Sequence, residues 1–404
     1  MPLENYIGWA YLLAGPGVWG VFLFGMIKWR DRLRLLRRPI QPLPDPPPRV
    51  SVLVPIKDEE KQIDKCLASV LGQDYPDVQF IAINDRSVDR TGEILDGLSL
   101  RDSRIRVVHI REGELPPEWV GKSHALHVGM KHADGQWVLF VDSDVELTPD
   151  ALSATIGLAE YKRFDLVSLL PRLITESFWE RLIVPLGGMV TSAMFMLPMT
   201  NMNEWPGVAF ANGQYLCVRR SAYEAIGGHE AAKETLSEDI AIAKALKKAS
   251  YRPRLSDGTD FAATRMYSSL PMIMRGWARN FFCGGAGNPL RTVVAMLFIL
   301  LACFSAYAAL GWGVYCGIHS VDSWQGRGWM ITGVIHLLIM TTALAINYRW
   351  TGNPIRYAML FPLGGGIMLA IMTRTVWMCL TGRVEWRATR YTHKMGQGLV
   401  SPTQ

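Results

Sequence analysis

The chain has 404 residues, 49% hydrophobic and 19% charged, with a mean hydropathy of +0.12, which indicates membrane segments beside a soluble domain. Its net charge of +6 comes largely from local basic clusters, which argues against a nucleic-acid-binding surface. The six cysteines lack C-x-x-C or Cys/His metal spacing, so we expect reduced, mostly buried cysteines and no disulfide scaffold.

The first predicted element is a membrane-spanning helix from Tyr6 to Ile27, long enough to cross a bilayer. It contains Gly15-Pro16-Gly17, which a membrane helix tolerates with a kink. No basic segment precedes it and no small-residue cleavage site follows it, so an uncleaved anchor is expected. The basic cluster from Lys28 to Arg38 marks the cytoplasmic side and suits contact with anionic lipid. We therefore predict an anchor at 1–28 and a basic, Pro-rich linker at 29–49.

Short apolar strands alternate with helical stretches from Val50 to about Phe282. This alternation predicts an α/β domain at 50–290, with a mainly parallel mixed sheet and helices on both faces. The predicted strands are Ser51–Pro55, Val78–Asn84, Arg106–Ile110, Trp137–Val141, Asp165–Leu169 and two later, partly antiparallel ones, Gln214–Val218 and Arg252–Ser256. The predicted helices are Glu60–Leu71, Thr91–Leu98, Ser123–Ala133 and Ile240–Ala249.

The segment 178–199 is strongly apolar but carries Glu180, Arg181 and two prolines. We expect a helix and loop lying in the membrane interface. A buried core helix and a short span are the alternatives.

The C-terminal region 291–382 is predicted to hold two to three membrane segments. Val293–Gly317 and Trp329–Asn347 have the length and composition of spans. Tyr357–Leu380 contains Pro362, three consecutive glycines and Arg374, which is costly inside a bilayer. A third span would also leave the basic tail 383–404 outside, against the positive-inside tendency, so we favour a re-entrant or interfacial segment. The basic residues of that tail are Arg383, Arg387, Arg390 and Lys394.

Three of the predicted strands end in acidic residues, and the carboxyl ends of such strands are where ligands bind in open α/β sheets. These ends are Lys57-Asp58-Glu59, Asn84-Asp85 and Asp142-Ser143-Asp144. No Lys or Arg stands beside the Asp-x-Asp pair, whose carboxylates suit Mg²⁺ or Mn²⁺. An Asx-turn capping the next helix is the structural alternative. Because like charges repel, three acidic ends at one edge indicate a nucleotide at Asp85 and a metal at Asp142 and Asp144.

The stretches Val52–Glu59, Asn84–Thr91 and Asp142–Asp144, in this order, resemble motifs of a large inverting glycosyltransferase family with the GT-A fold. That family includes cellulose, chitin and hyaluronan synthases, and the resemblance covers about Arg49 to Phe282. It implies a nucleotide-sugar donor, most of all a UDP-sugar, with Asp85 at the uracil. The remaining donor-site residues that it implies are Pro55, Lys57, Glu59, Asp142 and Ser143, with Asp142 and Asp144 on the metal.

Two further stretches are similar to motifs of membrane-anchored lipid glycosyltransferases, such as the ceramide, hopanoid-associated and carotenoid enzymes. Pro117–Ala125 resembles their W-x-G-K-x-x-A segment, which implies that Lys122 meets the donor at a helix start that favours anions. An exposed lysine is the alternative. Ser237-Glu238-Asp239 stands in the place of the family's E-D motif, which implies Glu238 and Asp239 as catalytic residues, with Asp239 the general base. A helix start capped by Ser237 is the compatible structural alternative.

The membrane-bound members then carry Q/R-x-x-R-W, and this chain departs from that motif. It has Met272 at the first position, and Gly276 separates Arg275 from Trp277. With Arg279, the stretch still offers two cations and an indole, implied to contact the diphosphate or the acceptor. An interfacial aromatic and basic anchor is the alternative.

These features together predict a membrane-bound inverting glycosyltransferase that transfers a sugar from a nucleotide-sugar to a lipid or lipid-linked hydroxyl, using Mg²⁺ or Mn²⁺. We expect a bacterial-type inner membrane, a catalytic domain facing the cytoplasm, an acceptor entering from the bilayer, and no nucleic-acid partner. A processive polysaccharide synthase and a non-catalytic GT-A-like membrane scaffold are the alternatives. A nicotinamide-dependent Rossmann enzyme is disfavoured because no G-x-G-x-x-G follows the first strand.

Overall fold

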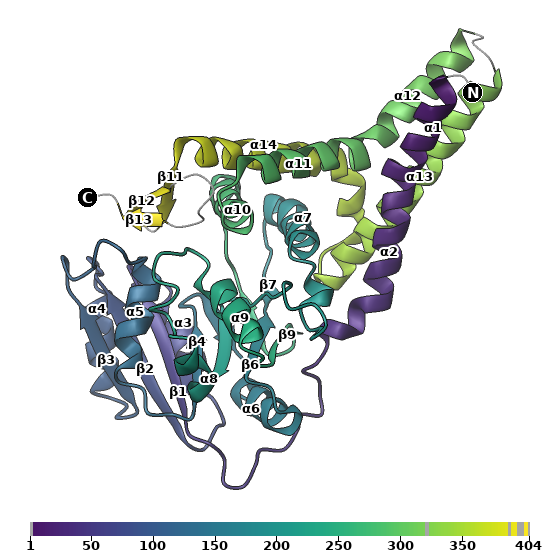
Figure 1. Ribbon diagram of the computed structural model, residues 1–404. Coiled ribbons are helices and arrows are strands. Elements are labelled where there is room, and N and C mark those ends of the chain that lie inside the picture. The colour runs from purple at the N-terminus through teal and green to yellow at the C-terminus, as the bar shows by residue number, and fades with distance from the viewer. Residues whose placement is uncertain (1–2, 320–322, 387–388, 394–399, 403–404) are drawn as a thin grey trace. The chain divides into compact units, whose positions relative to one another are not determined.

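A computed structural model describes residues 3–319, 323–386, 389–393 and 400–402 (Figure 1). The chain divides into two compact units. The sheet unit contains Asp31–Ile174, Ser192–Met266 and Gly382–Gln404, and the helical unit contains Met1–Arg30, Thr175–Thr191 and Tyr267–Thr381. Two stretches of the predicted domain 50–290, residues 175–191 and 267–290, thus belong to the helical unit. Their apolar helices pack on the C-terminal helices, as when Tyr348 Oη donates to the Leu182 carbonyl at 2.7 Å.

The sheet unit is built on seven strands in the order β3-β2-β1-β4-β8-β6-β9. They are β1 (Val50–Ile56), β2 (Val78–Asp85), β3 (Ile105–Ile110), β4 (Trp137–Val141), β6 (Leu166–Leu170), β8 (Tyr215–Arg219) and β9 (Pro253–Asp257). β8 is antiparallel to both neighbours, as predicted for that strand. β9 was also predicted to be partly antiparallel, and this is wrong, because it pairs in parallel with β6. The predicted mixed α/β fold is confirmed.

Helices cover both faces of this sheet because its side chains alternate between two apolar clusters. Val52 and Val54 point toward α3 (Ile63–Leu71), α4 (Thr91–Ser99) and α6 (Ala151–Lys162). Leu53 points toward the opposite cluster, with α5 (Gly121–Met130), α8 (Arg220–Ala225) and α9 (Glu238–Lys248). Both α5 and α9 begin two residues earlier than predicted. This places Lys122, Glu238 and Asp239 in the first turns of helices.

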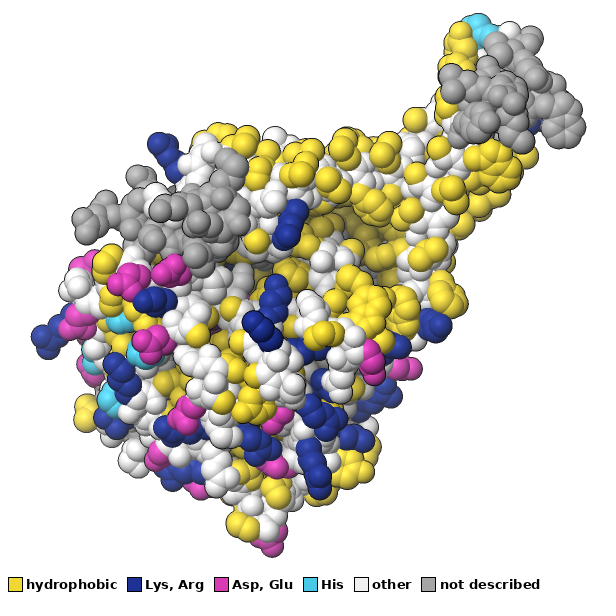
Figure 2. Space-filling view, in the orientation of Figure 1, with side chains coloured by type: hydrophobic (Ala, Val, Ile, Leu, Met, Phe, Trp, Pro, Cys, Tyr) yellow, Lys and Arg dark blue, Asp and Glu magenta, His cyan; other side chains and the backbone are white. Residues whose placement is uncertain are grey.

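Among the described residues, four segments are long and apolar enough to cross a membrane: Ile7–Leu33, Pro289–Ile318, Gly326–Trp350 and Ile355–Thr381. They belong to the helical unit, except that the first extends into residues 31–33 of the sheet unit. The helices of these segments are α1 (Leu3–Leu12), α2 (Val18–Trp29), α11 (Pro289–Ile299), α12 (Ser305–Ile318), α13 (Ser323–Trp350) and α14 (Phe361–Thr381). The helical unit also contains α10 (Leu270–Gly284) and most of α7 (Phe178–Met194). Hydrophobic side chains gather over this unit in Figure 2, and Leu297, Trp312 and Leu338 are each at least half exposed. Such a surface fits a lipid environment.

The last of these segments is the one for which a re-entrant or interfacial course was favoured. The structure makes α14 one continuous helix of 21 residues. Whether it spans the bilayer or lies in the interface stays a prediction, as does the membrane-interface position of 178–199.

The predicted basic tail contains a three-stranded antiparallel sheet. Its strands are β11 (Arg383–Trp386), β12 (Thr389–His393) and β13 (Val400–Pro402). Val384 and Tyr391 lie opposite each other in register, and both are buried. Apolar residues at alternate positions form this sheet, and the basic composition concealed that pattern. Arg387 and Lys394 lie outside the described residues.

The predicted linker runs against α6, and one glycine makes that approach possible. A Cβ on Gly157, inside α6, would overlap the carbonyl oxygen of Gln41, whereas a Cβ on Gly97, inside α4, would meet nothing within 4 Å. We expect Gly157→Ala to destabilise the protein by about 1–3 kcal/mol through overpacking. Gly97→Ala should raise stability by about 0.5–1 kcal/mol through helix propensity. Thermal unfolding of the two variants checks this, and equal shifts of the melting temperature would contradict it.

Candidate active site

The loops that follow β1 and β2 are tied to each other. Asp58, at φ 52°, accepts the Val88 N–H at 2.8 Å, and its own N–H donates to Ser87 Oγ at 3.0 Å. The Glu59 N–H donates to Thr91 Oγ1 at 2.9 Å. Asp58 thus holds the two loops together. Of the predicted donor residues, Pro55 lies within β1, and Lys57 and Glu59 follow its end.

The loop after β4 carries the Asp-x-Asp pair and joins the first loop through Ser143. Ser143 Oγ donates to Glu59 Oε1 at 3.2 Å and is almost fully buried. Burial raises the pKa of the nearby Cys66 thiol, and the carboxylates of Asp144, Asp142 and Glu59 raise it further. Negative charge is therefore concentrated where these loops meet, as a site for a cation requires.

A lysine meets this acidic edge in space, although none stands beside it in the sequence. Lys122 Nζ lies 2.7 Å from Asp142 Oδ1 and 2.9 Å from Glu238 Oε1. The expectation that no cation pairs the Asp-x-Asp carboxylates is therefore wrong, because α5 brings one from 20 residues earlier. The alternative that Lys122 is an exposed lysine is also wrong, since its side chain is only 17% exposed.

Asp239 lies beside this cluster in the first turn of α9. Its Oδ2 accepts the Gly213 N–H at 2.7 Å, and its Oδ1 accepts the Ile240 N–H at 2.7 Å. Ser237 occupies the N-cap position of α9, but its side chain makes no capping hydrogen bond. The predicted capping role of Ser237 is therefore wrong. Gly213 was not singled out from the sequence, although a glycine just before a strand signals a close approach.

Burial and charge set the protonation of this cluster. Burial raises the pKa of Asp239, the neighbouring Glu238 carboxylate raises it further, and the Lys122 ammonium and two backbone N–H groups oppose them, leaving it at about 7. Burial lowers the pKa of Lys122, but the three carboxylates around it outweigh this and keep the pKa above its usual value. Asp239 is thus a carboxyl group that changes charge near neutral pH, as a general base needs to.

The predicted nucleotide contact Asp85 is held by its sequence neighbour. Arg86 Nε and Nη2 lie 2.7 and 2.8 Å from the two carboxylate oxygens of Asp85, and both side chains are buried. Gly121 packs against this pair, since a Cβ there would lie 2.5 Å from Arg86 Nη2. Arg86 was not predicted as a site residue, although its adjacency to Asp85 was a signal.

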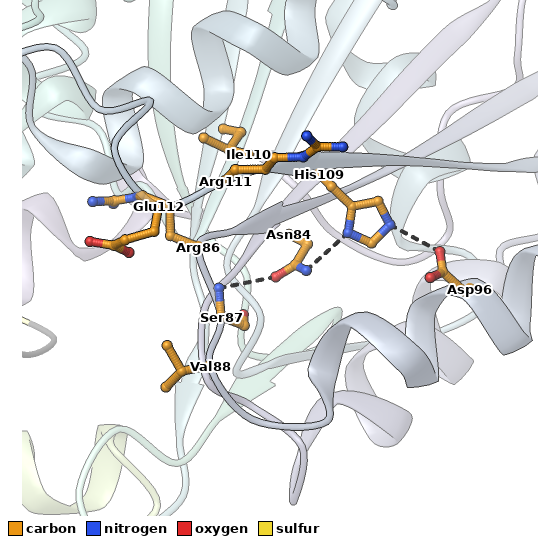
Figure 3. Close-up of a pocket in the computed structure, with 9 residues that line it drawn as sticks. All are labelled: Asn84, Arg86, Ser87, Val88, Asp96, His109, Ile110, Arg111 and Glu112. Atoms are coloured by element: carbon orange, nitrogen blue, oxygen red, sulfur yellow. Dashed lines mark hydrogen bonds and ion pairs between the residues drawn. The ribbon is translucent and has the colours of Figure 1, made fainter.

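A pocket of about 470 Å³ lies behind the same loop, at the ends of β2 and β3 (Figure 3). Asn84 Nδ2 donates to His109 Nδ1 at 3.0 Å, and His109 Nε2 donates to Asp96 Oδ1 at 2.9 Å. The Ser87 N–H donates to Asn84 Oδ1 at 3.3 Å. This chain of hydrogen bonds orders the loop after β2 from its outer side. The pocket contains none of the predicted site residues.

The three predicted residues of the altered Q/R-x-x-R-W stretch lie on α10, in the helical unit. Arg275 is exposed and Arg279 partly so. Trp277 is 4% exposed and packs on Gly187, where a Cβ would overlap the indole. The indole is therefore packed inside the helical unit, and whether the stretch serves the site or anchors the chain at the interface stays a prediction. Gly276 is required by packing, because a Cβ there would overlap the Tyr267 ring.

Among the described residues, no group of three or more His, Cys, Asp or Glu side chains forms a complete metal site. Asp142 and Asp144 supply hard oxygen ligands at an edge with concentrated negative charge. They fit a Mg²⁺ or Mn²⁺ ion whose other ligands come from a bound ligand or water.

Comparison with known proteins extends this description. Residues 51–227 match the family model described as glycosyl transferase family 2. A 4,4'-diaponeurosporenoate glycosyltransferase of Staphylococcus aureus (strain USA300) is 28% identical over 264 residues, which cover 65% of this chain and 68% of that protein. One of Staphylococcus haemolyticus (strain JCSC1435) is 25% identical over 276 residues, covering 66% and 70%. The solved structure of mannosyltransferase PcManGT from Pyrobaculum calidifontis, in complex with GDP-Man and Mn²⁺, matches with a TM-score of 0.51 and 17% identity, covering 94% of this chain and 99% of that one. This last likeness concerns the fold, which is GT-A.

Proposed function

We propose that this glycosyltransferase, with its glycosyl transferase family 2 domain and membrane helices, transfers a sugar from a nucleotide-sugar to a hydroxyl group of a membrane lipid, with inversion at the anomeric carbon. The observation that carries the proposal is the cluster of Lys122, Asp142, Glu238 and Asp239 at the carboxyl ends of the strands. It joins a cation for a diphosphate to a carboxylate near its ionisation point.

The donor is a nucleotide-sugar, and a UDP-sugar is the first candidate. It binds across the ends of β1, β2 and β4, where Pro55, Lys57, Glu59, Asp85 and Ser143 lie. Asp142 and Asp144 would hold Mg²⁺ or Mn²⁺, and the PcManGT structure contains Mn²⁺ beside its nucleotide-sugar. The metal, when bound, stabilises the charge that develops on the leaving diphosphate. Lys122 adds a second positive charge on the same side.

Asp239 is the general base that takes the proton from the acceptor hydroxyl. A single displacement then forms the bond to the anomeric carbon as the bond to the diphosphate oxygen breaks, which inverts the configuration. Glu238 forms an ion pair with Lys122 at 2.9 Å and so positions the ammonium group.

The acceptor is an amphiphilic lipid with a hydroxyl group. The helical unit has apolar exposed faces, and the two curated relatives reported above are named for 4,4'-diaponeurosporenoate. We place the protein in a bacterial-type cell membrane with its sheet unit in the cytoplasm, where nucleotide-sugars are made. Arg275, Trp277 and Arg279 are proposed to serve the acceptor or the diphosphate.

The test is a panel of nucleotide-sugars incubated with membranes that contain the protein and a total lipid extract. Mass analysis should detect one new glycolipid that is absent with the Asp239→Asn variant. Growth of a water-soluble glycan instead would favour a polysaccharide synthase. Absence of transfer and of donor hydrolysis with every donor would favour a non-catalytic scaffold.

Lys122→Met gives a second, independent test. The variant should lose about a hundredfold in kcat/KM, because an ammonium that faces developing phosphate charge is removed. Lys122 lowers the pKa of Asp239, so its removal should also move the rising limb of the pH–rate profile to higher pH. Lys131→Met, at the exposed end of the same helix, is the matched control. An unchanged profile in Lys122→Met would contradict the coupling of the two residues.

A further inference from the structure

The C-terminal sheet reaches the start of α5, about 270 residues away in the chain. The Gly121 N–H donates to Tyr391 Oη at 3.3 Å, and this contact lies within the sheet unit. Tyr391 is 4% exposed and comes from β12. Strand β12, which lies in the segment predicted only as a basic tail, thus contacts the first turn of α5, which carries Lys122.

We propose that Tyr391 is a positioning residue of the donor site, whose hydroxyl fixes Gly121 and, through it, the Lys122 ammonium and the Asp85–Arg86 pair. This inference rests on the proposed nucleotide-sugar function. It adds the C-terminal sheet to a site whose sequence-predicted residues all lie between positions 55 and 279. It concerns the binding of the nucleoside diphosphate part of the donor.

Three contacts around Gly121 support the role. Gly121 packs on the Asp85–Arg86 pair, where its missing side chain leaves room for the Arg86 guanidinium. Lys122, the next residue, bridges Asp142 and Glu238. The Tyr391 side chain also lies near the Arg86 guanidinium. The Tyr391 hydroxyl therefore lies beside Gly121 and near Arg86, which are the sequence neighbours of the proposed donor residues Lys122 and Asp85.

The same turn of α5 holds polar atoms that fit a ligand. Ser123 Oγ and His124 Nδ1 are buried and have no hydrogen-bond partner among the described residues. His124 is electrostatically coupled to both Asp85 and Arg86, so its ring lies near that pair. Buried polar atoms of this kind are costly unless a ligand or water satisfies them. Binding of a polar ligand at the start of α5 would satisfy these atoms, and Tyr391 contacts the same turn through Gly121.

A purely structural tyrosine would act through its ring, and phenylalanine would replace it without loss. A positioning role acts through the hydroxyl. Tyr391→Phe should therefore raise the donor KM and the dissociation constant of UDP or GDP by about tenfold, the effect of one lost hydrogen bond to a buried amide. The acceptor KM should stay within about twofold of wild type, because the hydroxyl acts on the donor side of the site.

The experiment uses the full-length protein in nanodiscs, titrated with UDP and with GDP in the presence of Mn²⁺. Tyr161→Phe, an exposed tyrosine on α6, is the matched control and should leave all values unchanged. Wild-type affinity in Tyr391→Phe would overturn the inference, as would tighter binding, which would make Tyr391 an obstacle to the donor. Wild-type protein that binds neither nucleotide would instead contradict the proposed function, so the two failures are distinguishable.

Discussion

Asp239→Asn is expected to lower kcat for sugar transfer by about 10²–10⁴-fold, the range that a general base contributes. Asparagine has nearly the same shape and keeps an oxygen for the Gly213 N–H, which now donates at 2.7 Å. It cannot accept a proton from the acceptor. Donor affinity should stay within about threefold of wild type, because the residue acts on the acceptor side of the reaction.

The pH dependence of the wild-type rate tests the same assignment. The pKa of Asp239 is about 7, raised by burial and by Glu238. Below that pH the carboxyl is protonated and unable to act as a base, so kcat should fall by about tenfold per pH unit as the pH drops. Above it the rate should level off. This limb should be absent from the residual activity of Asp239→Asn.

Asp64→Asn is the matched control, since Asp64 is also an aspartate in the first turn of a helix but is exposed on α3. Its rate and pH profile should equal those of wild type. Near-normal transfer by Asp239→Asn would refute the general-base role, and Glu238 would then be the next candidate.

The strands and the motif-bearing loops were predictable because their signals are local. Buried runs such as Trp137–Val141 alternate with helical stretches, and the acids follow the strand ends directly. Strands β2, β1 and β4 are parallel neighbours, so Asp85, Asp142 and Asp144 lie at one edge of the sheet, as the sequence predicted; their roles stay predictions. The parallel course of β9 was missed, because an edge strand carries no sequence signal for its direction.

The contacts that define the site were not predictable, because they join distant residues. The Lys122 ammonium pairs with Asp142, 20 positions on, and with Glu238, more than a hundred positions on. Gly213 reaches Asp239 from the loop before β8. Tyr391 comes from a segment in which basic residues masked a short alternating pattern. Such pairings follow from the topology of the sheet and not from any window of the sequence.

Asp144→Ala is expected to remove most of the metal dependence of donor binding. In wild type, Mn²⁺ should tighten the binding of UDP or GDP by about two to three orders of magnitude, because a divalent cation offsets the charge of a diphosphate. Without the Asp144 carboxylate, the ion would lose one of the two protein ligands proposed for it after β4. Nucleotide titrations with Mn²⁺ and with EDTA should then give nearly the same affinity.

Glu146→Ala is the control, because Glu146 is an exposed acid on β5 (Val145–Leu147), two residues from Asp144. It lowers the negative charge of the same segment by the same amount, so it separates ligation from general electrostatics. Measurements without metal and with the Lys122→Met variant further distinguish a ligand role of Asp144 from a general charge effect. If Asp144 acted only by its charge, its loss would relieve repulsion of the diphosphate and tighten metal-free binding. A ligand role predicts that the difference between the Mn²⁺ and EDTA affinities collapses in Asp144→Ala and persists in Lys122→Met, because an ammonium group is not a ligand of the ion.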